Sequence, residues 1–318
     1  LDRSSAASDV YKRQVLQTSV SYGAAATGRQ VAEPLNTSLR SFCLQTAIYA
    51  IRSLHAELVL YPKPGLVSPI DNGSHCDMDA DLFMRSLFSL RHYFRQMAHA
   101  GSESATFDGL KNLAVQAERR MLAATGGINT HRGAIFSLGL LCAAAGYSRA
   151  QALALTPDNL RQVIRQQWGA ALLDHASPSV AKLSNGIRVS HLYAVSGART
   201  EGAQGFPAVF ETGLPQLLQS FAQGRDASSA QVDALFALMT QMTDTNIYHR
   251  GGTVGAALVR LAAQDFMQLG GTGHPDWRDT ALACHRLFVD RNLSPGGAAD
   301  MLSASWLVYQ LTHTVVRG

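Results

Sequence analysis

The sequence is poor in several features that mark particular classes of protein. Only 16% of its 318 residues are charged, four are cysteines, and no two cysteines form a CxxC pair. So few cysteines in a chain of this length argue against a disulfide-stapled secreted scaffold and favour a reducing, cytoplasmic setting. No run of about 18 apolar residues is present, so we expect no membrane span. The N-terminal region has no apolar stretch of the secretory kind, and no signal peptide is expected.

Basic residues slightly outnumber acidic ones, but they do not gather. The formal net charge is +4 and the pI is about 9.0, yet lysines and arginines are scattered singly. No nucleic-acid partner is therefore expected, although a mild positive field would suit small anions. GxSxG and HExxH sequences are missing as well, which argues against a serine hydrolase and a zinc protease.

Composition divides the chain into a short leader and a long folded part. Residues 1–38 are rich in Ser, Ala, Thr and Gly and lack periodicity, so we expect a disordered or artefactual leader. Its opening, LDRSSAASDVYKRQ, resembles translated adapter sequence. Residues 39–318 contain no Pro/Ser-rich linker and no repeat. We expect them to form a single helical catalytic domain.

Apolar residues recur at helical spacing throughout the folded part. In the first helical segment they include Leu44, Ala47, Ile48 and Ile51, three or four residues apart in most steps. Segment 133–146, GAIFSLGLLCAAAG, is apolar all round, as is typical of a helix buried in a bundle. No segment alternates like a strand, so the sequence predicts an all-α fold, a large bundle-like domain with functional loops at helix junctions. Further helices are predicted over 79–100, 108–124, 158–175, 205–222, 228–243, 253–268, 277–290 and 297–315.

The first informative junction follows the first predicted helix. Glu57 precedes the turn Pro62-Lys63-Pro64-Gly65, where Lys63 is placed to bind a phosphate as a point charge. His75 and Asp77 follow in an acidic stretch. Carboxylates there fit magnesium (Mg²⁺), which prefers one or two carboxylates together with substrate phosphates. Capping of the next helix is the alternative role for these acids.

The second junction leads directly into the buried helix. It comprises Glu118 and then segment 125–133, which contains Asn129, Thr130, His131 and Arg132. Free backbone N–H groups at a helix N-terminus favour anions, so this segment is a candidate phosphate cradle. An ordinary helix cap is the alternative.

Two later junctions repeat the same ingredients. Segment 244–252 contains Asp244, Asn246, Arg250 and Gly251, and segment 292–300 contains Ser294, Gly296, Gly297 and Asp300. Helix capping accounts for each junction taken alone. Four such junctions together predict a shared cleft that holds Mg²⁺ and several phosphates.

These segments, in this order, resemble the triphosphoribosyl-dephospho-CoA synthase family. The likeness covers about residues 45–312. Segments 61–63, 196–199, 205–207, 213–217 and 247–250 look more like the malonate decarboxylase branch than the citrate lyase branch. Gly202 departs from the family pattern, in which Ala is usual. The matching motifs lie at 62–67, 72–78, 125–133, 244–252 and 292–300.

The resemblance implies a transferase that moves the 5-triphosphoribosyl group of ATP onto the 2′-hydroxyl of 3′-dephospho-CoA and releases adenine. The product would be the prosthetic-group precursor of the malonate decarboxylase acyl carrier protein, passed on to a carrier-protein transferase. The same reaction serving citrate lyase is the alternative. Inversion at the ribose C1 is implied, through an oxocarbenium-like transition state that a carboxylate stabilises. A homo-oligomer is compatible with the sequence.

The resemblance also gives the candidate residues their roles. The candidate catalytic carboxylates are Glu57, Asp77, Glu118 and Asp244. The candidate Mg²⁺ ligands are Asp77, Glu118, Asp244 and Asp300. The candidate substrate-binding residues are Lys63, His75, Asn129, Thr130, His131, Arg132, Asn246, Arg250, Gly251, Ser294, Gly296 and Gly297. Which carboxylate acts as base and which as metal ligand stays open at this stage.

Two other classes of protein share part of this pattern. An all-α, Mg²⁺-dependent hydrolase of nucleotides or ADP-ribosyl groups would also need acids and phosphate-binding loops. It would release adenine or phosphate from ATP without dephospho-CoA. A non-catalytic helical binding module would explain the buried helix, but it gives no reason for four polar glycine junctions.

Overall fold

The computed structural model describes residues 35–174 and 197–313, and these residues form helices and connecting loops without any β-strand. The predicted all-α fold is confirmed. Residues 35–38, predicted as the end of the leader, belong to the first turn of helix α2 (Leu35–Val59). The remaining part of the predicted leader, residues 1–34, lies outside the described ranges, as do Ser196 and the last residues of the final predicted helix.

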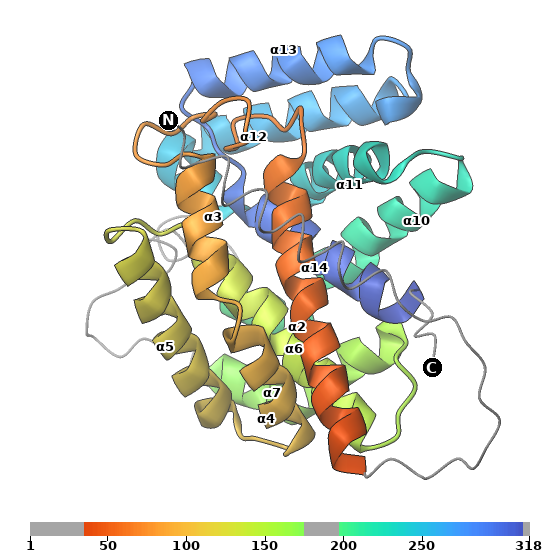
Figure 1. The fold of residues 1–318 in the computed structure, drawn as a ribbon. Coiled ribbons are helices and arrows are strands. Elements are labelled where there is room, and N and C mark those ends of the chain that lie inside the picture. Colours follow the sequence, from red (N-terminus) through yellow and green to blue (C-terminus); the bar gives the residue numbers. More distant parts are fainter. Residues whose placement is uncertain (1–34, 175–196, 314–318) are drawn as a thin grey trace, which may run out of the picture. The chain divides into compact units, whose positions relative to one another are not determined.

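The described helices follow the predicted pattern in most places (Figure 1). The first half contains α2 (Leu35–Val59), α3 (Ala80–Ser89), α4 (Tyr93–Ser102), α5 (Phe107–Ala124), α6 (Arg132–Ala150) and α7 (Pro157–Asp174). The second half contains α9 (Ala198–Ala203), the π-helix η1 (Ala208–Gly213), α10 (Leu214–Ala222), α11 (Ala227–Gln241), α12 (Thr245–Gln268), the 3₁₀ turn η2 (Gly271–Gly273), α13 (Trp277–Asp290) and α14 (Gly296–His313).

Helix α6 lies at the centre of the described fold. It packs against α4, α5, α7 and α14, and most of its residues are buried (Figure 1). Helices α6 and α4 approach each other closely at two glycines. A Cβ on Gly101 of α4 or on Gly146 of α6 would overlap backbone atoms of the facing helix. The prediction of a central buried helix is confirmed. By length and composition α6 could cross a membrane, but 72% of the tested stretch is buried inside the protein, as in a core helix.

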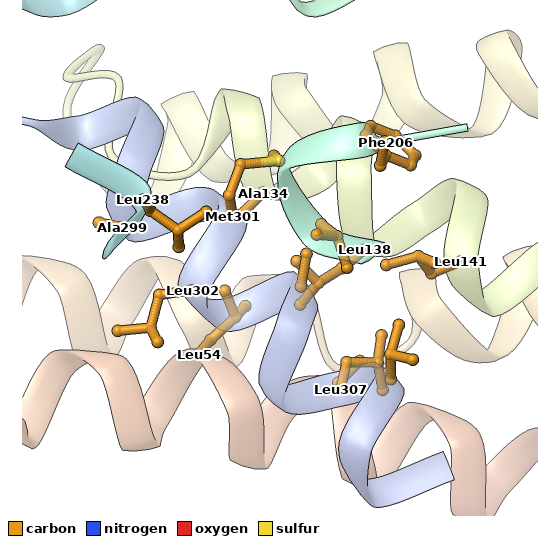
Figure 2. Packing of buried hydrophobic residues seen from close by; sticks show 14 of the residues in the cluster. Leu54, Ala134, Leu138, Leu141, Phe206, Leu238, Ala299, Met301, Leu302 and Leu307 are labelled. Carbon is orange, nitrogen blue, oxygen red and sulfur yellow. The ribbon is translucent and has the colours of Figure 1, made fainter. Parts of the chain in front are cut away.

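The core is aliphatic and draws on both halves of the chain. Figure 2 shows Leu54 of α2, Leu138 of α6, Leu238 of α11 and Leu302 of α14 gathered around the α14 ribbon. All four side chains are almost completely buried. Burial of this kind contributes about 1.5–3 kcal/mol per large aliphatic side chain relative to full exposure.

One predicted helix proves to be two. The segment predicted as 79–100 breaks after Ser89 and resumes at Tyr93, although no proline or glycine lies at the break. Leu90, Tyr93 and Phe94 are all fully buried on either side, and Tyr93 Oη donates to the Ile135 carbonyl over 2.9 Å. Tertiary packing therefore overrides the local helical pattern here.

The predicted loop at 244–252 is also partly helical. Helix α12 begins at Thr245 and is kinked at Gly252, which has φ 60° and ψ −155°, a conformation that favours glycine. A Cβ on Gly251 would lie 2.5 Å from Leu293 Cδ2, so glycine permits this contact. The first part of α12 lies against the 292–297 loop.

Candidate active site

A buried ion pair holds the first junction. Glu57 lies in the last turn of α2, and the following turn brings Lys63 back against it. Lys63 Nζ lies 2.6 Å from Glu57 Oε1 and donates to the Glu57 carbonyl over 2.7 Å. Burial lowers the pKa of Lys63, and the Glu57 charge opposes this effect. The lysine predicted to face a phosphate is thus paired inside the protein.

The first and fourth junctions pack directly on each other. Gly65 has φ +67°, and a Cβ there would overlap the carbonyl oxygen of Leu293. Ser74 Oγ donates to that same carbonyl over 2.6 Å, and His75 Nε2 lies 2.8 Å from Ser294 Oγ. Glycine at position 65 therefore permits two distant loops to form one surface.

Arg250 ties the third junction to this surface. Its guanidinium donates to the Ser74 carbonyl over 2.9 Å and to Asn292 Oδ1 over 2.7 Å, and it lies 3.0 Å from His75 Nδ1. Asp77 lies at the outer side of the same group, with its Oδ1 3.7 Å from His75 Nδ1 and its side chain 56% exposed.

Asp244 is buried where the N-termini of α12 and α14 meet. Its carboxylate accepts from the Asn246 N–H over 2.9 Å and from the Ala298 N–H over 3.1 Å. A Cβ on Gly297 would come within 2.9 Å of the carboxylate, and a Cβ on Gly296 would lie 3.0 Å from the Asn246 side chain. Burial raises the pKa of Asp244, while the backbone N–H groups lower it.

Asp300 faces the N-terminus of the central helix. It accepts a hydrogen bond from the Ala134 N–H of α6, and a Cβ on Gly133 would overlap its carboxylate. Asp300 keeps some exposed surface, but protein atoms surround it closely and this desolvation raises its pKa well above the usual range.

Three carboxylates therefore lie near one another. The charges of Glu57 and Asp244 both raise the pKa of Asp300 further. We call Glu57, Asp244 and Asp300 the carboxylate cluster. Because Asp244 and Asp300 accept from N–H groups at the starts of α12, α14 and α6, the positive ends of three helix dipoles meet there.

His131, in the second junction, lies close enough to Lys63 to feel its charge. It is buried, and burial together with the charge of Lys63 lowers its pKa to about 3. Its Nδ1 lies 2.6 Å from Ser86 Oγ, whereas its Nε2 has no hydrogen-bond partner in the described part of the chain. A buried ring nitrogen without a partner is a candidate contact for a ligand atom.

Three side chains of the second junction lie toward solvent, those of Glu118, Asn129 and Arg132. Arg132 Nε donates to Glu118 Oε1 over 2.6 Å, with both side chains substantially exposed. Asn129 Oδ1 accepts from the Arg132 N–H, the first N–H of α6, over 3.1 Å. Thus Glu118, Arg132 and Asp77 lie outside the buried carboxylate cluster, and their predicted roles remain predictions.

The structure adds two residues that sequence reasoning missed. Ser86, in the middle of α3, contacts His131, and His285 of α13 lies 3.2 Å from Asp71 Oδ1 and beside the Gly65 N–H. Both lie inside ordinary amphipathic helices without glycine or paired acids. Nothing in the sequence pattern distinguishes them from core or surface positions.

This arrangement suits chemistry on an anionic ligand with a developing positive charge. Helix N-termini favour phosphate groups, and the carboxylate cluster favours a cation or an oxocarbenium-like centre. Within residues 35–174 and 197–313, no three His, Cys, Asp or Glu side chains are arranged to hold a metal ion by themselves. Mg²⁺ bound through one or two carboxylates and substrate phosphates is compatible with that finding.

Fold and site together describe an all-α protein whose candidate catalytic groups lie at converging helix N-termini. Comparison with known proteins gives the family. The family model described as "CitG: ATP:dephospho-CoA triphosphoribosyl transferase" matches residues 43–317, which include every residue of the carboxylate cluster. The chain belongs to this family of transferases.

Curated relatives agree over nearly their whole length. A protein of Acinetobacter calcoaceticus named as a probable 2-(5″-triphosphoribosyl)-3′-dephosphocoenzyme-A synthase is 37% identical, over 89% of this chain and 97% of its own. A Pseudomonas fluorescens protein with the same probable name is 38% identical, over 86% and 94%. A Pectobacterium atrosepticum protein, named as that synthase, is 36% identical, over 81% and 86%. No solved structure matches the chain.

Proposed function

We propose that this chain transfers the triphosphoribosyl group of ATP to the 2′-hydroxyl of 3′-dephospho-CoA and releases adenine. The observation that carries the proposal is the carboxylate cluster at the N-termini of α6, α12 and α14. Family membership gives the substrates, and the cluster gives a place where a positive ribose centre and a triphosphate would both be stabilised.

The reaction breaks the bond between the ribose C1 and adenine and forms a bond from C1 to the 2′-oxygen. Positive charge develops at C1, and the carboxylates of Glu57 and Asp244 would stabilise it. One carboxylate of the cluster accepts the proton of the attacking hydroxyl, and the departing adenine gains a proton. A single displacement of this kind inverts C1.

The phosphates of ATP would bind along the second junction. The N-terminus of α6 lies there, with Asn129, Thr130 and Arg132 at its edge, and the positive end of its helix dipole favours phosphate. Lys63 and Arg250 already bind protein acceptors, so they would act mainly by fixing the loops that surround the substrate.

The cluster also fits magnesium. Burial raises the pKa of Asp300, and the charges of Glu57 and Asp244 raise it further, so a cation beside these hard oxygen donors would offset their repulsion; Asp300 also keeps some exposed surface. We propose that Asp244 and Asp300 hold Mg²⁺ together with substrate phosphates. Bound magnesium would neutralise charge on the triphosphate.

For the cellular setting we propose malonate decarboxylase maturation in the cytoplasm. The support is the likeness of segments 61–63, 205–207 and 213–217 to that branch, carried by the sequence alone. The product would pass to a carrier-protein transferase, and citrate lyase maturation is the alternative setting.

The test is chromatographic detection of adenine from ATP and Mg²⁺, with and without 3′-dephospho-CoA. We expect adenine only when dephospho-CoA is present, in equal amount with a heavier CoA product. Adenine or phosphate formed without the acceptor would instead support a nucleotide hydrolase. Folded protein that releases neither would support a binding module.

A further inference from the structure

His131 has an unusual set of neighbours for a histidine close to charged groups. The edge of its ring packs on Phe83, with ring centroids 5.0 Å apart, and its backbone N–H faces Met121 Sδ at 3.3 Å. The side chain is thus fixed on its apolar side. Its polar side offers two ring nitrogens, of which Nδ1 contacts Ser86 and Nε2 contacts nothing in the described residues.

A chain of hydroxyl groups determines which ring nitrogen carries the proton. Thr130 Oγ1 donates to Ser86 Oγ over 2.6 Å, and Ser86 Oγ lies 2.6 Å from His131 Nδ1. Ser86 has a single hydroxyl hydrogen, and because Thr130 is the donor in their shared contact, that hydrogen is left for His131 Nδ1. That hydrogen therefore points to Nδ1, which acts as an acceptor. A neutral ring then carries its own hydrogen on Nε2.

The ring is neutral in this position. Burial and the nearby charge of Lys63 both disfavour the imidazolium form, and the pKa of His131 falls to about 3. The unpartnered atom is therefore an N–H donor and not a lone pair. A buried N–H donor without an acceptor destabilises the free protein. A ligand atom that accepts this hydrogen bond would remove that penalty and so favour binding.

We propose that Ser86 is a positioning residue that, together with Thr130, fixes His131 in the Nε2–H tautomer, so that His131 donates a hydrogen bond to an acceptor atom of the bound nucleotide. The inference rests on the proposed function for the identity of that ligand. The tautomer of His131 is a property of the free protein, so that part of the inference does not depend on the proposed function.

Ser86 is placed to act only through His131. It is completely buried in α3, and the contacts of its hydroxyl group with other side chains are to Thr130 and His131. A serine-to-alanine change there leaves the imidazole in place but removes the group that selects its tautomer. Such a change should lower kcat about tenfold with little change in KM, in the range found when partners of catalytic ligands are removed.

The first experiment measures the tautomer by ¹⁵N NMR of the full chain with labelled histidine. His131 is assigned by the signal that disappears in His131→Gln. We expect a protonated Nε2 and an unprotonated Nδ1 in the wild type, a mixture of tautomers in Ser86→Ala, and no change in Ser89→Ala. Ser89 is the matched control, since it lies one turn further along α3 and donates only to the Ser86 carbonyl. A protonated Nδ1 in the wild type would overturn the inference.

The second experiment is a double-mutant cycle on adenine release. In His131→Gln, the side-chain amide places an N–H donor close to the position of Nε2. An amide has no tautomers, so this donor does not depend on Ser86. Ser86→Ala should therefore reduce kcat in the wild-type background and have no effect in the His131→Gln background. An equal loss in both backgrounds would show a merely structural role for Ser86. If the wild type releases no adenine, the proposed function fails, while the NMR result still decides the tautomer.

Discussion

At the scale of single residues, the two ion pairs of the site differ in burial more than in geometry. Lys63 and Glu57 pair at 2.6 Å with side chains 1% and 8% exposed, whereas Arg132 and Glu118 pair at 2.5 Å with side chains 47% and 30% exposed. Water screens the outer pair, so only the inner pair should matter for stability.

Lys63→Met tests this difference. It leaves the Glu57 carboxylate buried without a partner, so we expect it to lower the free energy of unfolding by about 3–5 kcal/mol. Arg132→Met, which breaks the exposed pair, should lower it by about 1 kcal/mol or less. Urea unfolding of both variants measures the difference. Equal losses would show that Lys63 is solvated in solution.

Glu118 tests whether the exposed pair serves activity. Its carboxylate holds the Arg132 guanidinium at the start of α6. We expect Glu118→Gln to keep its fold but to lose most of its adenine release. Glu211→Gln is the control, because Glu211 forms a comparable exposed pair with Arg161 away from the carboxylate cluster. Full turnover in Glu118→Gln would remove Glu118 from the candidate catalytic residues.

Asp300 gives a prediction for the dependence of stability on pH. Since the pKa of Asp300 is raised in the folded protein, the folded state holds this proton more tightly than the unfolded state. The free energy of unfolding therefore falls as pH rises from the ordinary aspartate pKa of about 4 through the raised value. Asp300→Asn removes this pH-dependent loss of stability. With EDTA present to remove metal ions, we expect the Tm of the variant to exceed that of the wild type at pH 7. At pH 3 we expect no such excess. The same Tm difference at both pH values would contradict the raised pKa.

At the scale of helices, close packing of α4 on α6 depends on glycine. Gly101 faces the Ala143 backbone, and a Cβ there would overlap it. We expect Gly101→Ala to lower the free energy of unfolding by about 1–3 kcal/mol. Gly109→Ala in α5 is the control, since its nearest neighbours lie at 3.7 Å and alanine is the better helix former, and it should be neutral or stabilising by up to about 1 kcal/mol. Equal stability of the two variants, measured by urea unfolding, would show that α4 and α6 lie further apart.

The helices were largely predictable from apolar spacing, and their interruptions were not. Segment 133–146 reads as a buried helix because every face is apolar, and α6 contains it. No residue near the break between α3 and α4 predicts it from the sequence. The break depends on the tertiary packing that buries Leu90 and Tyr93. The helical start of α12 was missed because paired glycine usually ends a helix, whereas here Gly252 only kinks it.

At the scale of the whole described fold, four loops that are far apart in sequence meet. Their residue types were sufficient to predict phosphate and carboxylate chemistry. The sequence could not show which acids are buried together, because that depends on helix packing. Asp244 and Asp300 lie with Glu57, while Asp77 faces solvent although it has the same local composition. Lys63 was predicted from its turn to face ligand, and only the fold shows its pairing with Glu57.

The central claim is that triphosphoribosyl transfer takes place at the carboxylate cluster. The most direct measurement is the rate of dephospho-CoA-dependent adenine release by Asp300→Asn beside the wild type, with Tm measured on both. We expect the variant to be folded and at least about 100-fold slower, the scale of losing one group that stabilises a transition state. A folded Asp300→Asn variant that releases adenine at the wild-type rate would contradict the claim.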